Sequence, residues 1–250
     1  MTSIFTPNYE ERFVPPGTGI RYNKGVSPLV IKGVVWHWTA NIAKGADAEA
    51  HFKYWRTPTT QYGAHYVVDD KKIIHVVPDN EVVWHAGPAA SYTSFIKNKF
   101  PKGANSSCIG VEMCVNSDGE WAKTYINAVN LGAYLCINYG WTPDENFVRH
   151  YDCTKKDCPR MMSPFVPGGD AAWVKFKTDV NNKLKGEGSA TMFKDIMNHW
   201  AKNDAEYLAS LGIFKGDGEG NFNPEEPITR AVLATVIART LNVIKEGKLK

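Results

Sequence analysis

Three residues far apart in the sequence have side chains that could bind one metal ion. His150 and Cys158 lie eight positions apart in a segment of small and polar residues, which favours a loop that folds back on itself. His37 is the best candidate for a third ligand, because it lies near the end of the apolar, β-prone run 34–39, which predicts a buried strand. Imidazole nitrogen and thiolate sulfur together favour Zn²⁺.

The number of protein ligands decides what such a site does. Three ligands leave the fourth tetrahedral position open for water, whose pKa zinc lowers toward neutrality, and such a site is catalytic. A fourth protein ligand would make the site structural. One His–Cys pair alone is weak evidence for a metal, and a lone buried histidine is also compatible with a core residue bonded to backbone.

Two further residues have charges that could act beside this site. Glu112 lies in the predicted strand 109–115, where Val111 and Met113 should point to one face and Glu112 to the other. Its carboxylate therefore points either toward the elements that pack on that side of the sheet or toward solvent. Lys156 precedes Cys158 by two residues. An exposed lysine is the alternative there, as we expect for its neighbour Lys155.

Five motifs occur in a fixed order within about residues 30–180. They are Val35–Ala40, Gly63–Val68, Trp84–Gly87, Ile109–Glu112 and His150–Pro159. In this order they resemble a type 2 N-acetylmuramoyl-L-alanine amidase, the family of phage T7 lysozyme and the peptidoglycan recognition proteins. The resemblance implies an α/β fold with a central mixed β-sheet flanked by helices. It also implies zinc-dependent hydrolysis of the amide between N-acetylmuramic acid and L-alanine in bacterial peptidoglycan.

The same resemblance implies a role for each candidate residue. The residues that match the zinc ligands are His37, His150 and Cys158. Glu112 matches a glutamate that assists the attacking water, and Lys156 would stabilise the oxyanion. His65 and His85 are expected to line the groove and bind substrate, with a supporting or structural role as the alternative.

The sequence departs from the family at one position. Phage T7 lysozyme has a catalytic tyrosine immediately before the histidine that matches His65, and here Ala64 stands there. Tyr62 should face the same side of an extended segment, but that alone does not assign it a role. Proton transfer would then depend more on Glu112. Thr39 could hydrogen-bond near the metal or simply pack.

The C-terminal part of the chain predicts a second, smaller helical domain. Residues 193–241 are similar to one S-layer homology repeat, so we expect a catalytic domain at 1–182, a linker at 183–190 and a cell-wall-binding domain at 191–250. The expected partner is an anionic secondary cell-wall polymer. We expect Arg230 to bind this polymer and Trp200 either to pack within the domain or to stack against the ligand. Such repeats often come in threes, so an oligomer is compatible with one repeat. Phe222 stands where a calcium loop needs glycine, which disfavours calcium at 217–221.

Composition excludes several other classes of function. The chain has 250 residues, 43% hydrophobic and 22% charged, with a net charge of +3, which is too mild to predict nucleic-acid binding. No apolar run is long enough for a membrane span, and the N-terminus has neither a basic nor an apolar signal region. We therefore expect synthesis in the cytoplasm and release by holin-type or other cell lysis. Five unpatterned cysteines favour a reducing compartment, and Cys153 has no expected ligand role.

Periodicity and turn residues predict the remaining elements. Residues 1–30 should form an extended arm and 86–107 a long loop. The expected helices and strands are a helix capped by Asp47, a hairpin at 64–69 and 72–77, a helix at 122–139, a strand ending at His150, a helix at about 168–180, and C-terminal helices at about 199–211 and 229–243, the last capped by Thr229.

Two other functions remain open at this point. A non-catalytic peptidoglycan-binding module would keep the fold but lack the cysteine ligand, so Cys158 and Lys156 favour an enzyme. A cytoplasmic amidase that recycles soluble muropeptides is the second alternative. The S-layer homology repeat argues against it, because that repeat suggests anchoring to a wall polymer.

Overall fold

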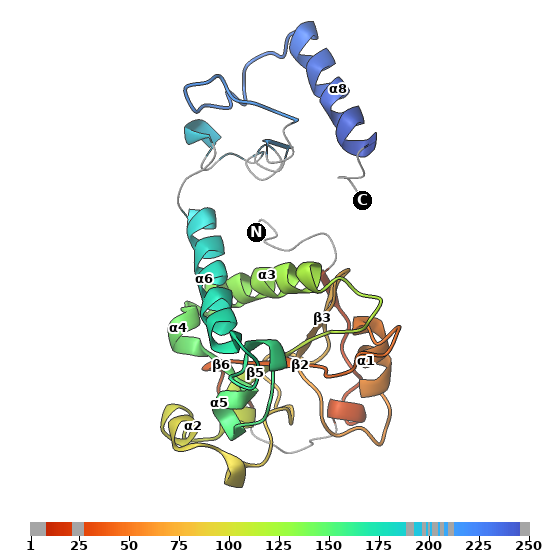
Figure 1. The fold of residues 1–250 in the computed structure, drawn as a ribbon, viewed down its shortest axis with the longest axis vertical. Helices are drawn as coiled ribbons and strands as arrows, with labels where there is room; N and C mark the ends of the chain where they lie inside the picture. Colours follow the sequence, from red (N-terminus) through yellow and green to blue (C-terminus); the bar gives the residue numbers. More distant parts are fainter. Residues whose placement is uncertain are drawn as a thin grey trace. The chain divides into compact units, whose positions relative to one another are not determined.

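A β-sheet forms the centre of the N-terminal part of the chain (Figure 1). It has six strands in the order β1-β4-β3-β5-β2-β6. The strands are β1 (Tyr9–Glu11), β2 (Gly33–Trp38), β3 (Tyr66–Val68), β4 (Ile73–His75), β5 (Cys108–Met113) and β6 (Phe147–Arg149). Only β3 and β4 pair antiparallel, and every other pair is parallel. The predicted α/β fold with a mixed sheet is confirmed.

The computed structural model describes residues 9–21, 28–188, 193–196, 199, 201, 205, 208–209 and 213–245. The chain divides into two units, Met1–Lys183 and Leu184–Lys250, and each is described by itself.

The pairing of β2 with β5 sets the geometry of the first unit. Both strands are almost wholly buried, as expected for central parallel strands covered on both faces. Their register places His37 opposite Glu112. Because side chains alternate along a strand, these two residues share one face of the sheet, whereas Trp36 points to the other.

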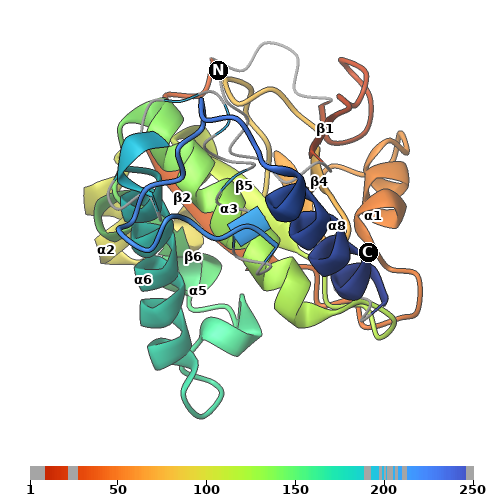
Figure 2. The same ribbon diagram turned by 90° about the horizontal axis from the view of Figure 1, so that it is seen from above.

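Helices cover both faces of this sheet. They are α1 (Ala48–Trp55), α2 (Ser94–Lys99), α3 (Trp121–Tyr139), α4 (Pro143–Asn146), α5 (His150–Thr154) and α6 (Gly169–Gly188), with 3₁₀ turns η1 (Gly19–Arg21), η2 (Ala89–Ser91), η3 (Ala104–Ser106) and η4 (Arg160–Met162). Helices α3 and α6 cover the face of Trp36, whose ring lies 4.7 Å from that of Phe176 (Figures 1 and 2). Helices α1, α2 and α5 pack on the opposite face, around Val67 and Val35.

Asp69 fixes the start of α1 against the β3–β4 hairpin. Its buried carboxylate accepts hydrogen bonds from the backbone N–H groups of Ala48 at 2.9 Å and of Lys71 and Lys72 at 2.7 Å each. Asp47 caps α1 from its own side by accepting from the Ala50 N–H at 2.9 Å, as predicted. The hairpin and the helix are therefore joined by charge-assisted hydrogen bonds, and the helix forms one wall over the sheet.

Several expectations about single elements were wrong. The segment 86–107 is not a plain loop, because α2 forms where Thr93 accepts a hydrogen bond from the Ile96 N–H at 3.3 Å and buries Ile96. The N-terminal arm is extended at Tyr9–Glu11, as expected, but the sequence did not indicate that this stretch is a strand, β1, paired with β4. The strand predicted to end at His150 ends at Arg149, and His150 begins α5. Helix α6 continues to Gly188, well beyond residue 180 and into the segment expected to be a linker.

The second unit contains a short turn, η5 (Lys194–Ile196), and helix α8 (Arg230–Lys245). Thr229 caps α8 by accepting a hydrogen bond from the Val232 N–H at 3.2 Å, as predicted. Most of the helix expected at 199–211, including Trp200, lies outside the described residues. Among the helices that the structure describes, none combines the length and apolar character needed to cross a lipid bilayer.

Candidate metal centre and groove

The structure brings His37, His150 and Cys158 together. Nδ1 of His37 lies 3.0 Å from Nδ1 of His150 and 3.7 Å from Sγ of Cys158. The three ligand atoms all lie within 4.8 Å of one another, and all three side chains are buried. Residues separated by more than a hundred positions thus converge on one point, as the sequence predicted.

Local structure around α5 holds two of these side chains in place. The Arg149 guanidinium donates to both carboxylate oxygens of Asp152, at 3.1 and 2.9 Å, and the Arg149 N–H also donates to Asp152 at 2.8 Å. This closes the first turn of α5 and orients His150. The chain then folds back, and the Tyr151 N–H donates to the Cys158 carbonyl at 2.8 Å. The predicted reversal of this segment is confirmed.

The donor set and its spacing fit Zn²⁺. Bonds of about 2.0 Å to nitrogen and about 2.3 Å to sulfur would separate tetrahedral nitrogen ligands by about 3.3 Å, and nitrogen from sulfur by about 3.6 Å. The observed separations of 3.0 and 3.7 Å are close to these values. Desolvation lowers the pKa of His150 to about 4 and that of His37 well below its ordinary value, which keeps both imidazoles in the neutral form that binds metal.

Glu112 lies next to His37 and faces the same space. Its Oε2 atom is buried and has no hydrogen-bond partner within the described part of the chain. Burial raises the pKa of this carboxyl to about 8, against the opposing effect of the Lys156 charge. The hydroxyl of Thr39, two residues beyond His37, is also buried without a partner among the described residues. Two polar groups beside the metal centre are thus available to a ligand.

Lys156 lines the same cavity, in contrast to its neighbour Lys155. Lys155 adopts a left-handed conformation with φ 63° at the end of α5, and its ammonium lies over the Tyr151 ring at 4.5 Å. Lys156 is exposed, and its charge lowers the pKa values of His37 and His150 after the larger effect of burial. The side chains of the two adjacent lysines therefore point in different directions.

His85 and His65 occupy different environments. His85 lines the cavity, and its Nδ1 lies 3.0 Å from Nε2 of His37. His65 is fully buried and does not line the cavity. Its Nδ1 accepts from the Gly110 N–H at 2.9 Å, and its Nε2 donates to the Glu81 carbonyl at 2.8 Å. Both ring nitrogens of His65 are thus used by the backbone.

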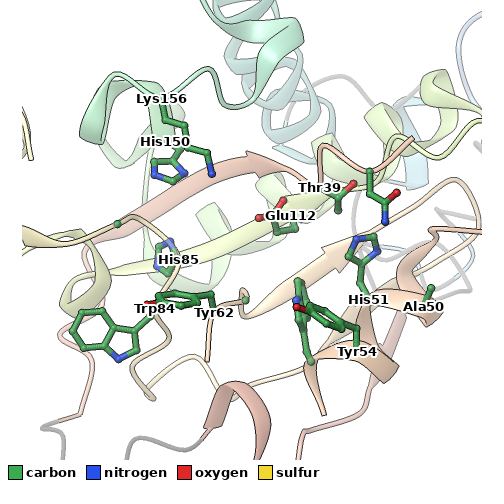
Figure 3. A pocket seen from close by; sticks show the side chains of 14 residues that line it. Thr39, Ala50, His51, Tyr54, Tyr62, Trp84, His85, Glu112, His150 and Lys156 are labelled. Carbon is green, nitrogen blue, oxygen red and sulfur yellow. The ribbon is translucent and has the colours of Figure 1, made fainter. Parts of the chain in front are cut away.

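A cavity of about 540 Å³ is lined by Thr39, His85, Glu112, His150 and Lys156 among others. Figure 3 shows His150 and Lys156 on one side of it, with Trp84, Tyr62 and Tyr54 on the other. The three aromatic side chains are 36%, 71% and 61% exposed. Such a surface beside a few polar groups is typical of a ligand groove.

Sequence reasoning did not identify Tyr54, His51 and Asn105 at the site. Tyr54 and His51 lie on one turn of α1 and line the cavity. Asn105 is buried, and its Oδ1 accepts from the N–H groups of His85 at 3.0 Å and Ala86 at 2.7 Å. The exposed position of Tyr54 on a helix was a usable indication. Asn105 lies in a stretch without periodicity, and nothing in the sequence pointed to it.

Together these features define an α/β protein with a buried centre of two histidines and one cysteine, placed beside a carboxylate at the floor of a groove. Residues 27–161, just over half of the chain, match the model of the family described as N-acetylmuramoyl-L-alanine amidase. The chain belongs to this family. Residues 193–231 match the S-layer homology domain.

Curated relatives carry the same family name. A probable N-acetylmuramoyl-L-alanine amidase of Bacillus licheniformis is 40% identical over 141 residues, which is 54% of this chain and 38% of that protein. The amidase XlyA of Bacillus subtilis strain 168 is 34% identical over 184 residues, covering 74% of this chain and 53% of XlyA. The chain thus spans about half the length, or less, of these two relatives.

Solved structures show the same fold. The catalytic domain of XlyA superposes with a TM-score of 0.56 at 31% identity, covering 69% of this chain and 99% of that domain. A mutant endolysin from Bacillus subtilis gives a TM-score of 0.57 at 32% identity, covering 69% of this chain and 98% of that structure. The expected architecture of the first unit is confirmed by both similarities.

Proposed function

We propose that the protein is a zinc-dependent N-acetylmuramoyl-L-alanine amidase, which hydrolyses the amide between N-acetylmuramic acid and L-alanine in bacterial peptidoglycan. The observation that carries the proposal is the convergence of His37, His150 and Cys158 next to a groove that His150 and Glu112 line, with one Glu112 oxygen unpartnered among the described residues. Membership of the amidase family supplies the substrate class.

The three ligand residues would hold Zn²⁺, which, when bound, acts as a Lewis acid and lowers the pKa of water. In the proposed reaction, water adds to the amide carbonyl carbon and the Glu112 carboxylate takes one of its protons. The Lys156 ammonium stabilises the carbonyl oxygen as it gains negative charge. The C–N bond then breaks, and Glu112 returns the proton to the amine of L-alanine.

The burial of Glu112 suits this double role. A group that first accepts and then gives up a proton works best when its pKa lies near the working pH. Burial raises the pKa of the Glu112 carboxyl to about 8, so neither protonation state is strongly disfavoured near neutrality. Because Ala64 replaces the tyrosine of phage T7 lysozyme and the Tyr62 side chain is 71% exposed, Glu112 is the better candidate for proton transfer.

Zinc analysis combined with the mass of the digestion products tests the proposal. Cys158→Ala and His150→Ala should lose zinc and activity together, because each removes one of three ligands. Glu112→Gln should keep zinc and lose most turnover. The proposal fails if purified protein digests peptidoglycan at the parent rate after Glu112→Gln, or if the products are cut at a glycosidic bond.

We further propose that residues 1–182 form the catalytic domain and residues 191–250 a domain that binds an anionic wall polymer. The S-layer homology match at residues 193–231 favours this second role, and Arg230 stands exposed at the start of α8. The full chain carrying Cys158→Ala should sediment with purified cell walls, and Arg230→Ala should reduce the bound fraction. Recovery of the Cys158→Ala protein in the supernatant would contradict wall binding.

A further inference from the structure

His37 uses both of its ring nitrogens. Nδ1 faces His150 and Cys158, whereas Nε2 lies 3.0 Å from Nδ1 of His85. The other nitrogen of His85, Nε2, lies 3.1 Å from the backbone carbonyl of Cys108. Three groups from β2, from the segment before η2 and from β5 thus form one chain of hydrogen bonds that ends at the metal centre.

The carbonyl at the end of this chain determines where each proton lies. A carbonyl oxygen only accepts, so Nε2 of His85 carries its proton and donates to Cys108. In a neutral imidazole, Nδ1 of His85 is then a bare acceptor, and Nε2 of His37 must donate to it. Nδ1 of His37 is left with a free lone pair that points at His150 and Cys158. That lone pair is what a metal ligand needs.

The opposite arrangement would prevent metal binding by this nitrogen. If His85 carried a proton on Nδ1 as well, Nε2 of His37 would have to accept it. The proton of neutral His37 would then lie on Nδ1, facing the other two ligands. The observed geometry favours the first arrangement, because one ring nitrogen of the buried His85 faces a carbonyl oxygen, which can only accept, and the other faces His37.

Neighbouring residues of the fold determine the position of the His85 ring. A Cβ atom at Gly110 of β5 would lie 2.7 Å from Cγ of His85 and 3.0 Å from its Nδ1, so a glycine is required where the ring lies against the strand. Asn105 holds the backbone of the same segment by accepting from the N–H groups of His85 and Ala86 and by donating to the Gly87 carbonyl at 2.9 Å. Gly110 therefore leaves room for the ring, and Asn105 fixes the backbone that carries it.

We propose that His85 is a positioning residue that fixes the tautomer of His37, so that Nδ1 of His37 is presented to Zn²⁺. This inference rests on the proposed zinc site and explains why a second histidine lies behind one of its ligands. Hydrogen bonds of this kind orient a metal-bound imidazole and raise its basicity, and their loss typically weakens metal binding by about 10- to 100-fold. His85 does not need to touch the substrate to act in this way.

Zinc affinity of the full chain, measured by competition with a chromophoric chelator, tests the proposal without using activity. His85→Phe keeps a ring of similar size and removes the acceptor, and it should weaken zinc binding about 10- to 100-fold. His85→Asn carries an acceptor oxygen on the branch where Nδ1 stood and should recover most of the affinity. Gly110→Ala alters none of the four histidine and cysteine side chains chemically, but its Cβ displaces the His85 ring, so it should also weaken zinc binding.

His51→Phe is the matched control. His51 also lines the cavity, but its Nδ1 bonds to the Asp47 carbonyl at 2.8 Å, so this variant should bind zinc like the parent. Far-UV circular dichroism of each variant verifies folding. If His85→Phe binds zinc as tightly as the parent, or if the Phe and Asn variants lose affinity equally, the proposal is overturned. A parent protein that binds no zinc would instead reject the proposed function itself.

A spectroscopic readout addresses the tautomer directly. In metal-free protein, two-bond ¹H–¹⁵N correlation spectra of ¹⁵N-histidine distinguish a ring protonated on Nε2 from one protonated on Nδ1. We expect His37 in the Nε2–H form in the parent and a mixture of both forms in His85→Phe. A parent spectrum with His37 in the Nδ1–H form would overturn the proposal.

Discussion

Replacing Glu112 by glutamine should stabilise the metal-free protein, by an amount that grows with pH. The structure buries one carboxylate oxygen of Glu112 without a partner in the described part of the chain. Burial raises the pKa of this carboxyl from its ordinary value of 4.5 to about 8, and the nearby Lys156 charge only partly opposes that effect. A neutral glutamine has the same shape and no charge to desolvate.

The sign follows from the protons that each state binds. Between about pH 4.5 and about pH 8, the folded protein keeps the Glu112 proton that the unfolded chain has lost. Because the folded state binds more protons, its free energy of unfolding falls as the pH rises through this window. At 1.36 kcal/mol per pKa unit the full effect is about 5 kcal/mol. Part of the side chain faces the groove, where water screens it, so we expect about 2 kcal/mol.

Urea unfolding at about pH 5 and about pH 8.5, with a chelator and a reducing agent present, measures this difference. In a separate run without the chelator, added zinc should move one unfolding transition to a higher urea concentration, and that transition belongs to the unit that holds the site. The gap in free energy of unfolding between Glu112→Gln and the parent should widen at the higher pH by about 2 kcal/mol, as the linkage relation requires. The exposed Glu145→Gln serves as the control and should show a constant gap. A constant gap for Glu112→Gln as well would refute the reasoning.

Two further predictions concern the lysine pair and the carboxylate that anchors α1. Lys156→Ala should lower kcat by about 10² without loss of zinc, because it removes one group that stabilises the developing oxyanion, whereas Lys155→Ala should leave kcat near the parent value. Steady-state kinetics with peptidoglycan and zinc analysis of both variants check this, and equal losses in the two variants would contradict it. In Asp69→Ala, the backbone N–H groups that donate to the Asp69 carboxylate lose their acceptor. We therefore expect the free energy of unfolding to fall by about 2–3 kcal/mol. Denaturant unfolding measures the loss, and a change below about 0.5 kcal/mol would show that the carboxylate is not needed there.

The long elements of the fold could be predicted from the sequence because their patterns are strong. The helix at 121–139 has a sustained apolar period and ends at Gly140, whose φ of 67° is the left-handed conformation that glycine adopts readily. The strands at 33–38 and 108–113 are mostly apolar, with His37 and Glu112 as the exceptions. The elements α2, α5 and β1 could not be predicted, because their sequences lack a sustained apolar pattern and tertiary contacts decide whether they form.

For the site as well, some features could be predicted from the sequence and others could not. The ligand types and their order along the chain indicated His37, His150 and Cys158, and the amidase resemblance supplied the role of each. The register that places His37 opposite Glu112 comes from a strand pairing that no local pattern encodes. The contact of His37 with His85 joins residues 48 positions apart, and whether a histidine nitrogen meets a substrate, a carbonyl or another ring depends wholly on such contacts.

Hydrogen-bond satisfaction separates the residues that build this site from those that would act on a ligand. His65 and His85 both matched a groove-lining role by sequence, yet each has both ring nitrogens in contact with backbone or with His37. Glu112 and Thr39 lie beside them with buried oxygens that no described residue satisfies. Because an unsatisfied buried polar group costs about 1–3 kcal/mol, it persists where a ligand or water completes it. We therefore expect substrate or water to meet Glu112 and Thr39, His85 to support His37, and His65 to support the backbone of β5.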